Sequence, residues 1–487
     1  MIYEELVGIV GAGNVSEAPE VLEAYSKDMS FAHPVRPDCV VKPGNAADVQ
    51  KIVQLANETL TPLTPVSSGS PHFRGDTIPG VGGAVIADLS GMKKIIRVDR
   101  PNRVAMCEPG VTFAELIAAT EAEGLRLNAP LAPRQSKSVV GSLLEREPVL
   151  MPRYHWDISD PLACVEVVLG TGDVFRTGAA AGPGTIEEQW RAGSAQRASS
   201  GPSQASFHRL IQGAQGTMGI VTWTSVACEK RPRIEEPFLV GSTNLERMTE
   251  LLHWFVKLRL VNECLLLNRA NVAAVLAREW PDGLREARAS LPPWVLLFST
   301  AGYDYLPEER LDYQIKDIRD ICRRVGVDPV PALSGIPASL LLDVVRRPSA
   351  EPYWKLRERG GCLDIFFLTL YDKLPGLMAV MAGLADEAGY AATEMGVYLQ
   401  PIVQGTNCHC EFNIFYDPQD AVESQRVRDL DRKAALKLAA AGAFFSRPYG
   451  ESARMIMNRD AATARALTKV KAVFDPNNIM NPGRLCF

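Results

Sequence analysis

Three clusters of small residues are the parts of this sequence best suited to hold a phosphate group. The first is the Ser/Gly run at 67–70, which follows a strand-like segment; the second spans 216–219, and the third is the Pro-Gly turn at 109–110. Small residues let several backbone N–H groups approach a pyrophosphate without obstruction from side chains. Each cluster alone is more often an ordinary turn, so the prediction of a phosphate site depends on their order and spacing.

His409 also invites a chemical interpretation, because it stands between Cys408 and Cys410. Histidine and cysteine are common metal ligands, but the stretch that runs to Asp417 has the pattern of a strand. Successive side chains of a strand point to opposite faces, so His409 would point away from both thiols. We therefore predict no metal site here.

The bulk composition predicts a globular protein of two domains. The chain has 487 residues, of which 46% are hydrophobic and 22% are charged. Single hydrophobic cores stop growing near about 250–300 residues, so a chain of this length is expected to divide. No tract has the composition of a segment that cannot bury a core.

Charge and hydropathy argue against two classes of partner. The formal net charge is −5, whereas nucleic-acid binding requires a basic face. Because there is no run of about 18 apolar residues and no basic leader, we expect no direct membrane insertion and a cytoplasmic location. The ten cysteines include no CxxC pair, which also fits a reducing compartment.

The first part of the chain has the signals of a mixed α and β domain that would position these clusters. Asn45 is placed to cap a helix over 46–59, and Thr112 to cap a helix that ends at Gly124. β-Branched alternation and a Thr-Gly-Asp turn indicate strands and a hairpin. The expected strands are 39–43, 63–66, 84–89, 94–98, 103–107, 163–169 and 174–176.

Beyond residue 231 the pattern changes to strands of period two that alternate with long helices, which predicts an antiparallel sheet covered by helices. Before this change, the Gly/Ala/Ser-rich stretch 179–206 is expected to be a surface excursion. A last helix at 461–474 and the segment 475–484 are expected to rejoin the first domain. The expected strands of the second domain are 237–241, 263–268, 294–303, 363–370, 396–403 and 410–416, and its helices are 245–258, 308–325, 374–388 and 421–441.

Seven short segments follow one another in an informative order. They are PVSSG at 65–69, AVIADLSGM at 84–92, VAMCEPGVT at 104–112, SVVG at 138–141, HW at 155–156 before VEVVL at 165–169, GTMGIVT at 216–222 and FDPNNIMNPG at 474–483. Together they resemble the FAD-linked oxidase family of vanillyl-alcohol oxidase and p-cresol methylhydroxylase. The resemblance spans nearly the whole chain.

This resemblance implies an α+β fold of two domains. An FAD-binding domain of the p-cresol methylhydroxylase (PCMH) type would be built from residues 1–231 and 445–487. A cap domain from residues 232–444, an antiparallel sheet covered by helices, would lie over the isoalloxazine ring. The implied cofactor contacts are Ser67, Ser68, Gly69, Ser70, Pro109, Gly110, Ser138, Val139, Gly141, Ser142, His155, Gly216, Gly219, Ile220, His409 and Arg484.

The resemblance leaves the role of His409 open. In vanillyl-alcohol oxidase a histidine in this register bonds covalently to the flavin methyl group, whereas the matching Asn-Leu-His of related D-2-hydroxyacid dehydrogenases forms no such bond. A covalent link would use one imidazole nitrogen as nucleophile and need the other held by a hydrogen bond. His72 is a rival, since some relatives attach the flavin through a histidine in the first phosphate loop.

The implied substrate pocket departs from that of phenol-oxidising relatives, which bind a phenolate with two tyrosines and an arginine. Arg74 stands at the first tyrosine position and Ser446 near the second, while Arg447 is retained. Near the flavin, where vanillyl-alcohol oxidase has an aspartate, residues 133–134 offer no carboxylate base. The pocket is therefore expected to be richer in arginine than that of a phenol oxidase.

Arginines dominate the catalytic set that we predict. Buried guanidinium groups need anionic, preferably bidentate partners, so convergence of Arg74, Arg134 and Arg447 would imply an acidic substrate. The alternative is that these arginines pair with protein carboxylates or contact the FAD phosphates. The predicted catalytic residues are Arg447, Arg74, Tyr449 and Arg134, with Tyr398 and Glu411 as secondary pocket candidates.

These observations predict an FAD-dependent oxidoreductase that takes a hydride from a small molecule to flavin N5. We expect an aromatic alcohol or para-alkylphenol-like substrate, with or without an acidic group. The first alternative is a D-2-hydroxyacid dehydrogenase-like flavoenzyme, although the metal-binding histidines of that branch are not found. The second is a flavin-bearing electron-transfer subunit of a larger complex. We expect a homodimer and a redox partner such as a cytochrome.

Overall fold

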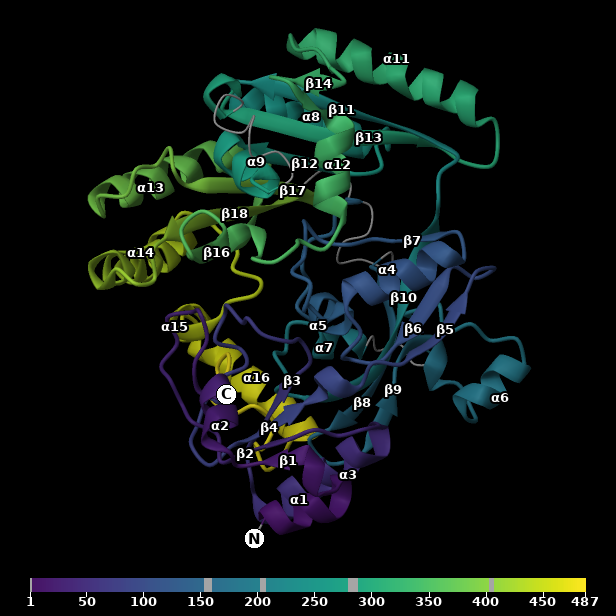
Figure 1. Cartoon of the computed structure of the whole chain (residues 1–487), viewed down its shortest axis with the longest axis vertical. Coiled ribbons are helices and arrows are strands. Elements are labelled where there is room, and N and C mark those ends of the chain that lie inside the picture. The colour runs from purple at the N-terminus through teal and green to yellow at the C-terminus, as the bar shows by residue number, and fades with distance from the viewer. Residues whose placement is uncertain (1, 153–159, 202–206, 279–287, 403–406) are drawn as a thin grey trace.

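The computed structural model describes residues 2–152, 160–201, 207–278, 288–402 and 407–487. It has two lobes: the lower one contains the N-terminal part of the chain and the C-terminal tail, and the upper one contains the residues between (Figure 1). The lobes contain separate sheets, and that of the upper lobe is antiparallel, which confirms the predicted fold class. Among the described residues, no helix has the length and apolar character needed to cross a bilayer.

A small sheet in the lower lobe leads directly into the first cluster of small residues. Its strand order is β1-β2-β4-β3, with β2, β4 and β3 parallel. The predicted cap of α3 is confirmed, since the Asn45 side chain accepts a hydrogen bond from the Asp48 N–H. Because β3 ends at Val66, residues 67–70 emerge at the carboxyl end of a parallel strand. The elements are α1 (Ile2–Val10), β1 (Val15–Ser16), α2 (Pro19–Ser26), β2 (Cys39–Val41), α3 (Ala46–Thr59), β3 (Leu63–Val66) and β4 (Val85–Asp88).

The second sheet of the lower lobe has six strands, in the order β5-β6-β10-β8-β9 with β7 beside β10. The predicted helix after Thr112 is α4, which begins with a capping box formed by Thr112 and Glu115. The excursion 179–206 contains a short helix, α6, that the sequence did not predict. The elements are β5 (Ile95–Asp99), β6 (Val104–Cys107), α4 (Phe113–Ala122), β7 (Leu125–Leu127), α5 (Val139–Leu144), β8 (Leu162–Leu169), β9 (Val174–Arg176), α6 (Ile186–Arg191), α7 (His208–Ile211) and β10 (Gly219–Lys230).

The upper lobe is a six-stranded antiparallel sheet in the order β11-β13-β12-β17-β18-β16. Four helices with apolar faces, α8, α11, α13 and α14, contribute to the core on one face of this sheet. On the other face, α9 and α12 pack over one end of the sheet, and the other end faces the lower lobe. The elements are β11 (Ile234–Ser242), α8 (Leu245–Lys257), β12 (Cys264–Asn268), α9 (Arg269–Leu276), β13 (Trp294–Gly302), α11 (Pro307–Val325), β14 (Ala332–Leu333), β15 (Ile336–Pro337), α12 (Ala338–Arg346), β16 (Gly361–Leu370), α13 (Leu374–Glu387), β17 (Gly396–Ile402), β18 (Asn407–Tyr416) and α14 (Ala421–Ala440).

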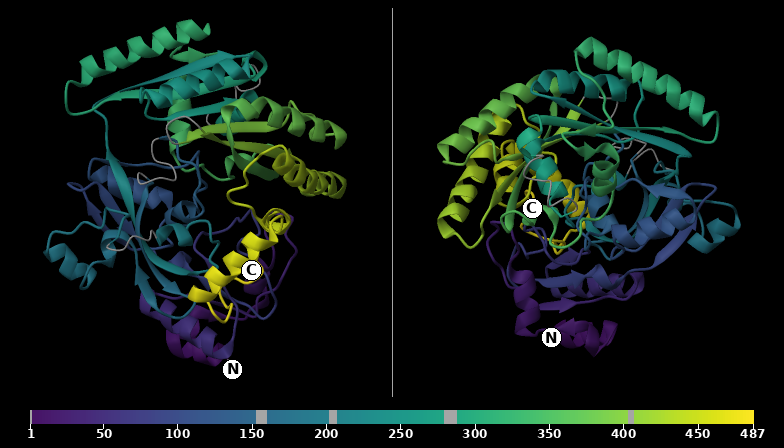
Figure 2. Two further views of the ribbon diagram at one scale, coloured as in Figure 1. Left: turned by 180° about the vertical axis from the view of Figure 1, so that it is seen from behind. Right: turned by 45° about the horizontal axis from the view of Figure 1, so that its top comes forward.

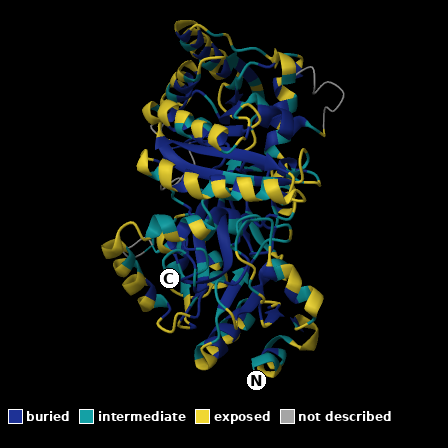
Figure 3. Ribbon diagram, turned by 90° about the vertical axis from the view of Figure 1, so that its left-hand side faces the viewer, coloured by how far each residue is buried: buried dark blue, intermediate teal, exposed yellow. Residues whose placement is uncertain are grey.

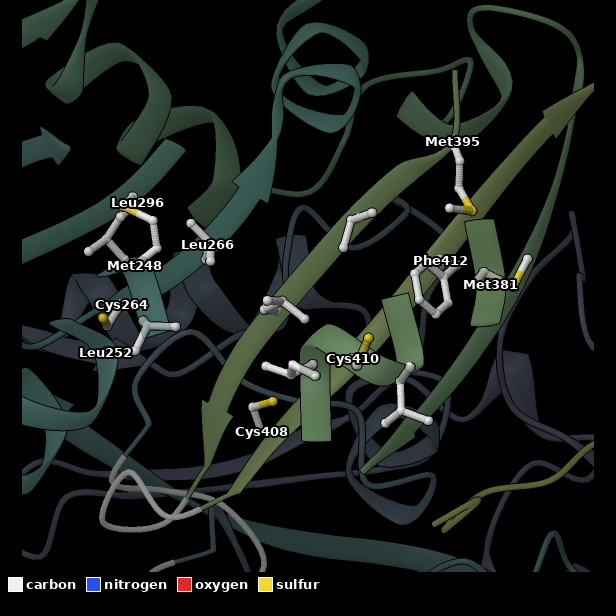
Figure 4. Close-up of a cluster of buried hydrophobic side chains, with 14 of the residues drawn as sticks. Met248, Leu252, Cys264, Leu266, Leu296, Met381, Met395, Cys408, Cys410 and Phe412 are labelled. Carbon is white, nitrogen blue, oxygen red and sulfur yellow. The ribbon is translucent and has the colours of Figure 1, made fainter. Parts of the chain in front are cut away.

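β18 has the strict alternation predicted for it. Cys408, Cys410 and Phe412 point into the helix-covered core, together with Met381 and Met395 (Figure 4). The odd-numbered residues of the strand therefore face the opposite side, where Phe415 packs into the core that includes α9 and α12. The described residues contain no cluster of side chains that could hold a metal ion.

The C-terminal tail returns to the lower lobe through α15 (Gly450–Met457) and α16 (Ala461–Phe474). α16 lies against the lower lobe near the N-terminal helices (Figure 2). Beyond it, the Leu63 N–H donates to Ile479 O over 2.7 Å and the Asn481 N–H to Leu63 O over 2.8 Å, so the tail extends the edge at β3. Strands of both lobes are buried, and exposed residues concentrate on the outer faces of helices (Figure 3).

Candidate active site

The three clusters of small residues meet at one cavity of the lower lobe, which we call the first cavity. Ser138, the N-cap of α5, joins two of the loops: its N–H donates to Ser68 Oγ over 3.0 Å and its hydroxyl donates to Pro109 O. The Gly69 N–H donates to Ser136 O over 3.0 Å. The predicted cofactor residues on the wall of the first cavity are Ser67, Ser68, Pro109, Gly141, Gly216, Gly219 and Ile220.

Two glycines allow these segments to approach one another closely. Gly216 has φ +73°, and a Cβ there would lie 2.5 Å from Pro65 Cγ. A Cβ on Gly141 would lie 2.9 Å from Ser67 Oγ. Any side chain at either position would push the loops apart, so glycine is required for their backbone groups to border one cavity.

The other predicted cofactor residues do not line the first cavity. Arg484 donates to Ile78 O and borders a separate cavity near the C-terminus, and His409 lies on the upper lobe. His155 falls outside the described residues. The remaining residues lie next to a wall residue along the chain or, for Ser70 and Ser138, two positions from one: Gly69, Ser70, Gly110, Ser138, Val139 and Ser142.

The wall of the first cavity also contains residues that sequence reasoning missed or left secondary. Asp76 and Thr77 were missed, because nothing in their type or spacing distinguishes them from other loop residues. His72, the alternative flavin attachment site, is on the wall. Burial, and after it the charge of Arg134, lowers the pKa of His72 to about 4, so this imidazole is neutral at physiological pH.

A second cavity lies between the two lobes and adjoins the first. Asp76, Arg134 and Glu145 border both cavities, so the second cavity begins where the first one ends. Its wall combines aromatic rings with charged side chains from both lobes. The aromatic members are Phe73, Tyr353, Trp354 and Tyr398, and the charged members are Arg74, Asp76, Arg134, Lys137, Glu145, Glu147, Lys355, Asp364, Glu411 and Arg447.

Arg74 is paired with carboxylates of the protein. Its Nη1 lies 2.5 Å from Glu145 Oε2 and 3.2 Å from Glu147 Oε1, and Lys137 Nζ contacts the same two carboxylates at 2.9 and 3.4 Å. Burial alone would raise the pKa of Glu147, but Lys137 and Arg74 hold it well below its ordinary value. The geometry at Arg74 is therefore the alternative considered above, a pair with protein carboxylates.

Arg134 braces the loop of the first cluster. Its Nη1 donates to Gly69 O over 2.6 Å, to Pro71 O, and to Ser136 Oγ over 3.2 Å. These acceptors are neutral, so the guanidinium charge is only partly compensated. Arg134 thus fixes the shape of the loop and places a positive charge at the junction of the two cavities.

Arg447 differs from both, because it is buried and two of its donor nitrogens have no hydrogen-bond partner among the described residues. Arg447 is 3% exposed, and its Nε and Nη1 atoms have no hydrogen-bond partner in the described part of the chain. Its Cζ lies 4.3 Å from the centre of the Phe366 ring. Burial, and after it the nearby Arg74, lowers the pKa of Arg447. A buried guanidinium of this kind is expected to receive an anion from outside the chain.

The lobe-facing side of the cap sheet holds a buried network around Glu411. Glu411 Oε2 lies 3.1 Å from His409 Nε2, and Glu411 Oε1 lies 2.5 Å from Lys355 Nζ, which also contacts Asp364 at 2.7 Å. Burial lowers the pKa of His409, although Glu411 acts in the opposite sense. Glu411 borders the second cavity, whereas His409, 2% exposed, borders neither cavity.

The predicted substrate residues thus lie on the walls of the two adjoining cavities, and each has different hydrogen-bond and ion-pair partners. Arg74, Arg134 and Arg447 border the second cavity, and Tyr449 borders the first. The Tyr449 ring centre lies 5.3 Å from Arg74 Cζ, so this tyrosine stands close to the pair of cavities. Lys355 and Asp364 were not predicted, because only the folded cap sheet brings them to the wall.

The first cavity has the chemistry that an FAD diphosphate and ring system require. Small residues and backbone groups from separate loops border it, and its glycines leave the space that a Cβ would fill. Two family matches agree with this assignment. Residues 37–178 match the FAD binding domain family, and residues 369–485 match the family of the C-terminal domain of FAD linked oxidases.

Known proteins of several activities resemble the chain over nearly its full length. The glycolate oxidase subunit GlcD of Bacillus subtilis is 22% identical, with 99% of this chain and 96% of the relative covered. The flavoprotein subunit of 4-cresol dehydrogenase from Pseudomonas putida is 24% identical, with 98% and 93% covered. A crystal structure of p-cresol methylhydroxylase with substrate bound superposes with a TM-score of 0.86 at 21% identity, covering 100% of this chain and 96% of that one. The chain is therefore an enzyme of the FAD-linked oxidase family, an FAD-dependent oxidoreductase with an FAD-binding domain of the PCMH type.

Proposed function

We propose that this oxidoreductase acts on an aromatic alcohol or para-alkylphenol-like molecule that carries an anionic group. The observation that supports the proposal is Arg447, a buried guanidinium with no ion-pair partner among the described residues, on the wall of a cavity that also presents aromatic rings. The rings offer stacking surfaces for an aromatic substrate, and the guanidinium offers two donors to a carboxylate or phenolate. Glu145 and Glu411, two carboxylates on this wall, already contact other cationic side chains of the protein.

Residues of the two cavities have separate roles in substrate binding and proton transfer. Bound FAD supplies an acceptor for hydride at N5. Arg447 holds the anionic group. Phe73 and Tyr353, whose rings contact each other with centres 5.7 Å apart, together offer one aromatic surface for the aromatic part of the substrate. Asp76 borders both cavities and is the carboxylate placed to accept the proton of a substrate hydroxyl.

Anaerobic bleaching of the flavin tests this function directly. The holoenzyme is mixed under nitrogen with matched compounds: 4-(hydroxymethyl)benzoate, neutral benzyl alcohol, 4-cresol, glycolate and D-lactate. We expect the visible absorbance of the flavin to be lost fastest with the aromatic anion, and this preference to disappear in Arg447→Met but not in Arg323→Met, which changes an exposed arginine of α11.

A second candidate, a 2-hydroxyacid as substrate, has the same anchor in its favour, because a carboxylate would also bind Arg447. The similarity to a glycolate oxidase subunit adds to this alternative. Bleaching by glycolate or D-lactate but by no aromatic compound would establish it. Bleaching by none of the compounds would leave the electron-transfer subunit as the function.

We further infer that His409 forms no covalent bond with the flavin, because this residue is 2% exposed and borders neither cavity. After acid precipitation, we expect the yellow colour of His409→Ala to divide between pellet and supernatant as that of wild type does. Colour that stays in the wild-type pellet but not in that of His409→Ala would instead establish a bond to this histidine.

A further inference from the structure

Two more cavities extend from the active site towards the C-terminal helices. The third cavity shares Phe73, Arg74, Asp364 and Arg447 with the second cavity. The fourth cavity shares its wall with the third through six residues, Phe31, Ala32, Arg428, Arg432, Gly450 and Glu451. The fourth, third and second cavities therefore adjoin one another in a row that ends at Arg447.

The fourth cavity lies where separate parts of the chain meet. α14 contributes Arg428 and Arg432, α15 contributes Arg454, and the tail after α16 contributes Arg484. Loops of the N-terminal part, including His33 and Ile78, complete the wall. In Figure 1, α15 lies below the end of α14 and above α16, at the left-hand side of the molecule.

The walls of the third and fourth cavities carry an excess of positive charge. Their arginines are Arg74, Arg428, Arg432, Arg447, Arg454 and Arg484, and their acidic residues are Asp364, Asp431 and Glu451. Two of the three acids are already engaged: Glu451 accepts from Arg432 at 2.7 and 2.8 Å, and Asp364 contacts Lys355 at 2.7 Å. Arg432 is paired with Glu451, and Arg74 with Glu145 and Glu147, so Asp431 is the remaining acid of these walls beside Arg428, Arg447, Arg454 and Arg484.

Several of these arginines have unsatisfied donors. Arg484 is 9% exposed, and its Nε has no hydrogen-bond partner among the described residues. The Nε of Arg428 is likewise buried without a partner there. Burial of unsatisfied donors and uncompensated charge is costly, so a bound anion would stabilise this arrangement. Arg428, Arg447 and Arg484 therefore have the properties of a binding site, and Arg432 and Arg454 are exposed beside them.

The charge of the rest of the protein makes this excess more effective. The whole chain has a formal net charge of −5, so an anion is repelled by most of the molecule and attracted here. A cleft that concentrates charge of one sign raises the local concentration of ions of the opposite sign and their rate of association by about 10-fold or more. This effect falls as salt screens the field.

We propose that the fourth and third cavities form an anion-binding vestibule, through which small carboxylates or other organic anions reach the second cavity. Arg428 and Arg454 are the outer contacts, and Arg447 is the inner one. The identity of the anion as the aromatic substrate rests on the proposed function, whereas the vestibule itself rests on the charges and cavities just described.

The test uses a small anionic reductant that needs no substrate specificity. The double variant Arg428→Met/Arg454→Met and the matched control Arg323→Met are compared with wild type as flavin-loaded proteins. Flavin bleaching is followed by stopped flow with dithionite, an anion, and with reduced methyl viologen, a cation. We expect dithionite to act about threefold or more slowly on the double variant at low salt, with the difference vanishing at high salt.

The control and the cationic reductant define the outcomes. Arg323→Met should behave as wild type, and methyl viologen should not be slowed in the double variant. Equal dithionite rates in wild type and double variant at low salt would overturn the vestibule. If the double variant does not fold, Arg454→Met, at an exposed position, provides the same comparison. Because these rates need no substrate, failure of every compound in the bleaching panel would refute the proposed function and leave this test intact.

Discussion

Replacement of Arg447 by methionine is expected to stabilise the protein while it weakens anion binding. Methionine keeps an unbranched stem of similar length against Phe366 but removes the charge. In the absence of a ligand, the guanidinium leaves two N–H donors, at Nε and Nη1, without partners among the described residues. The substitution therefore removes the unsatisfied buried donors of the free protein, and it also removes the charged contact with the anion in the complex.

The structure sets the size of both effects. An unsatisfied buried donor costs about 1–3 kcal/mol, so two cost about 2–6 kcal/mol, and the contact of the guanidinium with the Phe366 ring, at 4.3 Å, returns about 0.5–2 kcal/mol. We expect a net gain of about 2 kcal/mol, or a rise in the melting temperature of about 4–8 °C. Loss of a buried charged hydrogen bond to the ligand costs about 2–5 kcal/mol, which is about 30-fold to several thousand-fold in Kd.

Two measurements on each variant check this reasoning. Thermal unfolding is recorded without ligand, and benzoate binding is followed through the flavin spectrum, with benzyl alcohol as the neutral comparison. Arg74→Met is the matched control, since it removes the partner of Glu145 and Glu147 and should lower stability by about 2 kcal/mol or more. Both expectations are contradicted if Arg447→Met is destabilised to the same extent as Arg74→Met, and the expected loss of anion binding is contradicted if Arg447→Met binds benzoate as tightly as wild type.

Three further substitutions have defined outcomes. Gly216→Ala, which places a Cβ 2.5 Å from Pro65 Cγ, should cost about 1–3 kcal/mol and weaken FAD retention on a desalting column. Burial alone would raise the pKa of Glu263, but Arg126 and Arg346 lower it to about 2. This carboxylate therefore stabilises the fold above its unfolded pKa of about 4.3 and loses that effect as the pH falls towards 2. Glu263→Gln should lower the free energy of unfolding in urea by about 3–5 kcal/mol at pH 7 and by less at pH 3. Burial raises the pKa of the partly exposed Asp431 from 3.8 to about 6, so its ionisation opposes folding above that pH. Asp431→Asn should raise the free energy of unfolding by about 1 kcal/mol at pH 8 and leave it unchanged at pH 3.5.

Elements with one buried face were predictable from the sequence, and elements without such a contrast were not. α8 and α11 alternate buried and exposed residues at helical spacing, and both were predicted within a few residues of their observed ends. α9 was missed because every residue from Ala270 to Leu276 is buried, so no polar face marks its period. α6 was missed because it is short and follows a Gly-rich stretch.

The phosphate loops were predictable for a different reason, since residue type alone restricts what can stand there. Gly216 has a positive φ and a close contact with the Pro65 ring, and Gly141 lies close to the Ser67 side chain. Gly141 and the helix cap Ser138 were predicted through the family resemblance. The wall of the second cavity has no local signature. Arg74 lies 71 residues from Glu145 along the chain, and their contact depends on how the loops fold.

The three arginines of the active site show what sequence alone could not decide. Each is the same residue type, and each borders the second cavity, but Arg74 is neutralised by two carboxylates, Arg134 braces a loop of carbonyl oxygens, and Arg447 has two donors without partners among the described residues. The positive charge left for a ligand follows only after the pairs within the protein have been subtracted, because carboxylates beside a guanidinium offset its charge. After that subtraction Arg134 remains at the junction of the first and second cavities, and Arg447 at the inner end of a row of cavities whose outer arginines include unsatisfied donors. The negative ligand that we propose would account for both ends of the row, and a neutral substrate would account for neither.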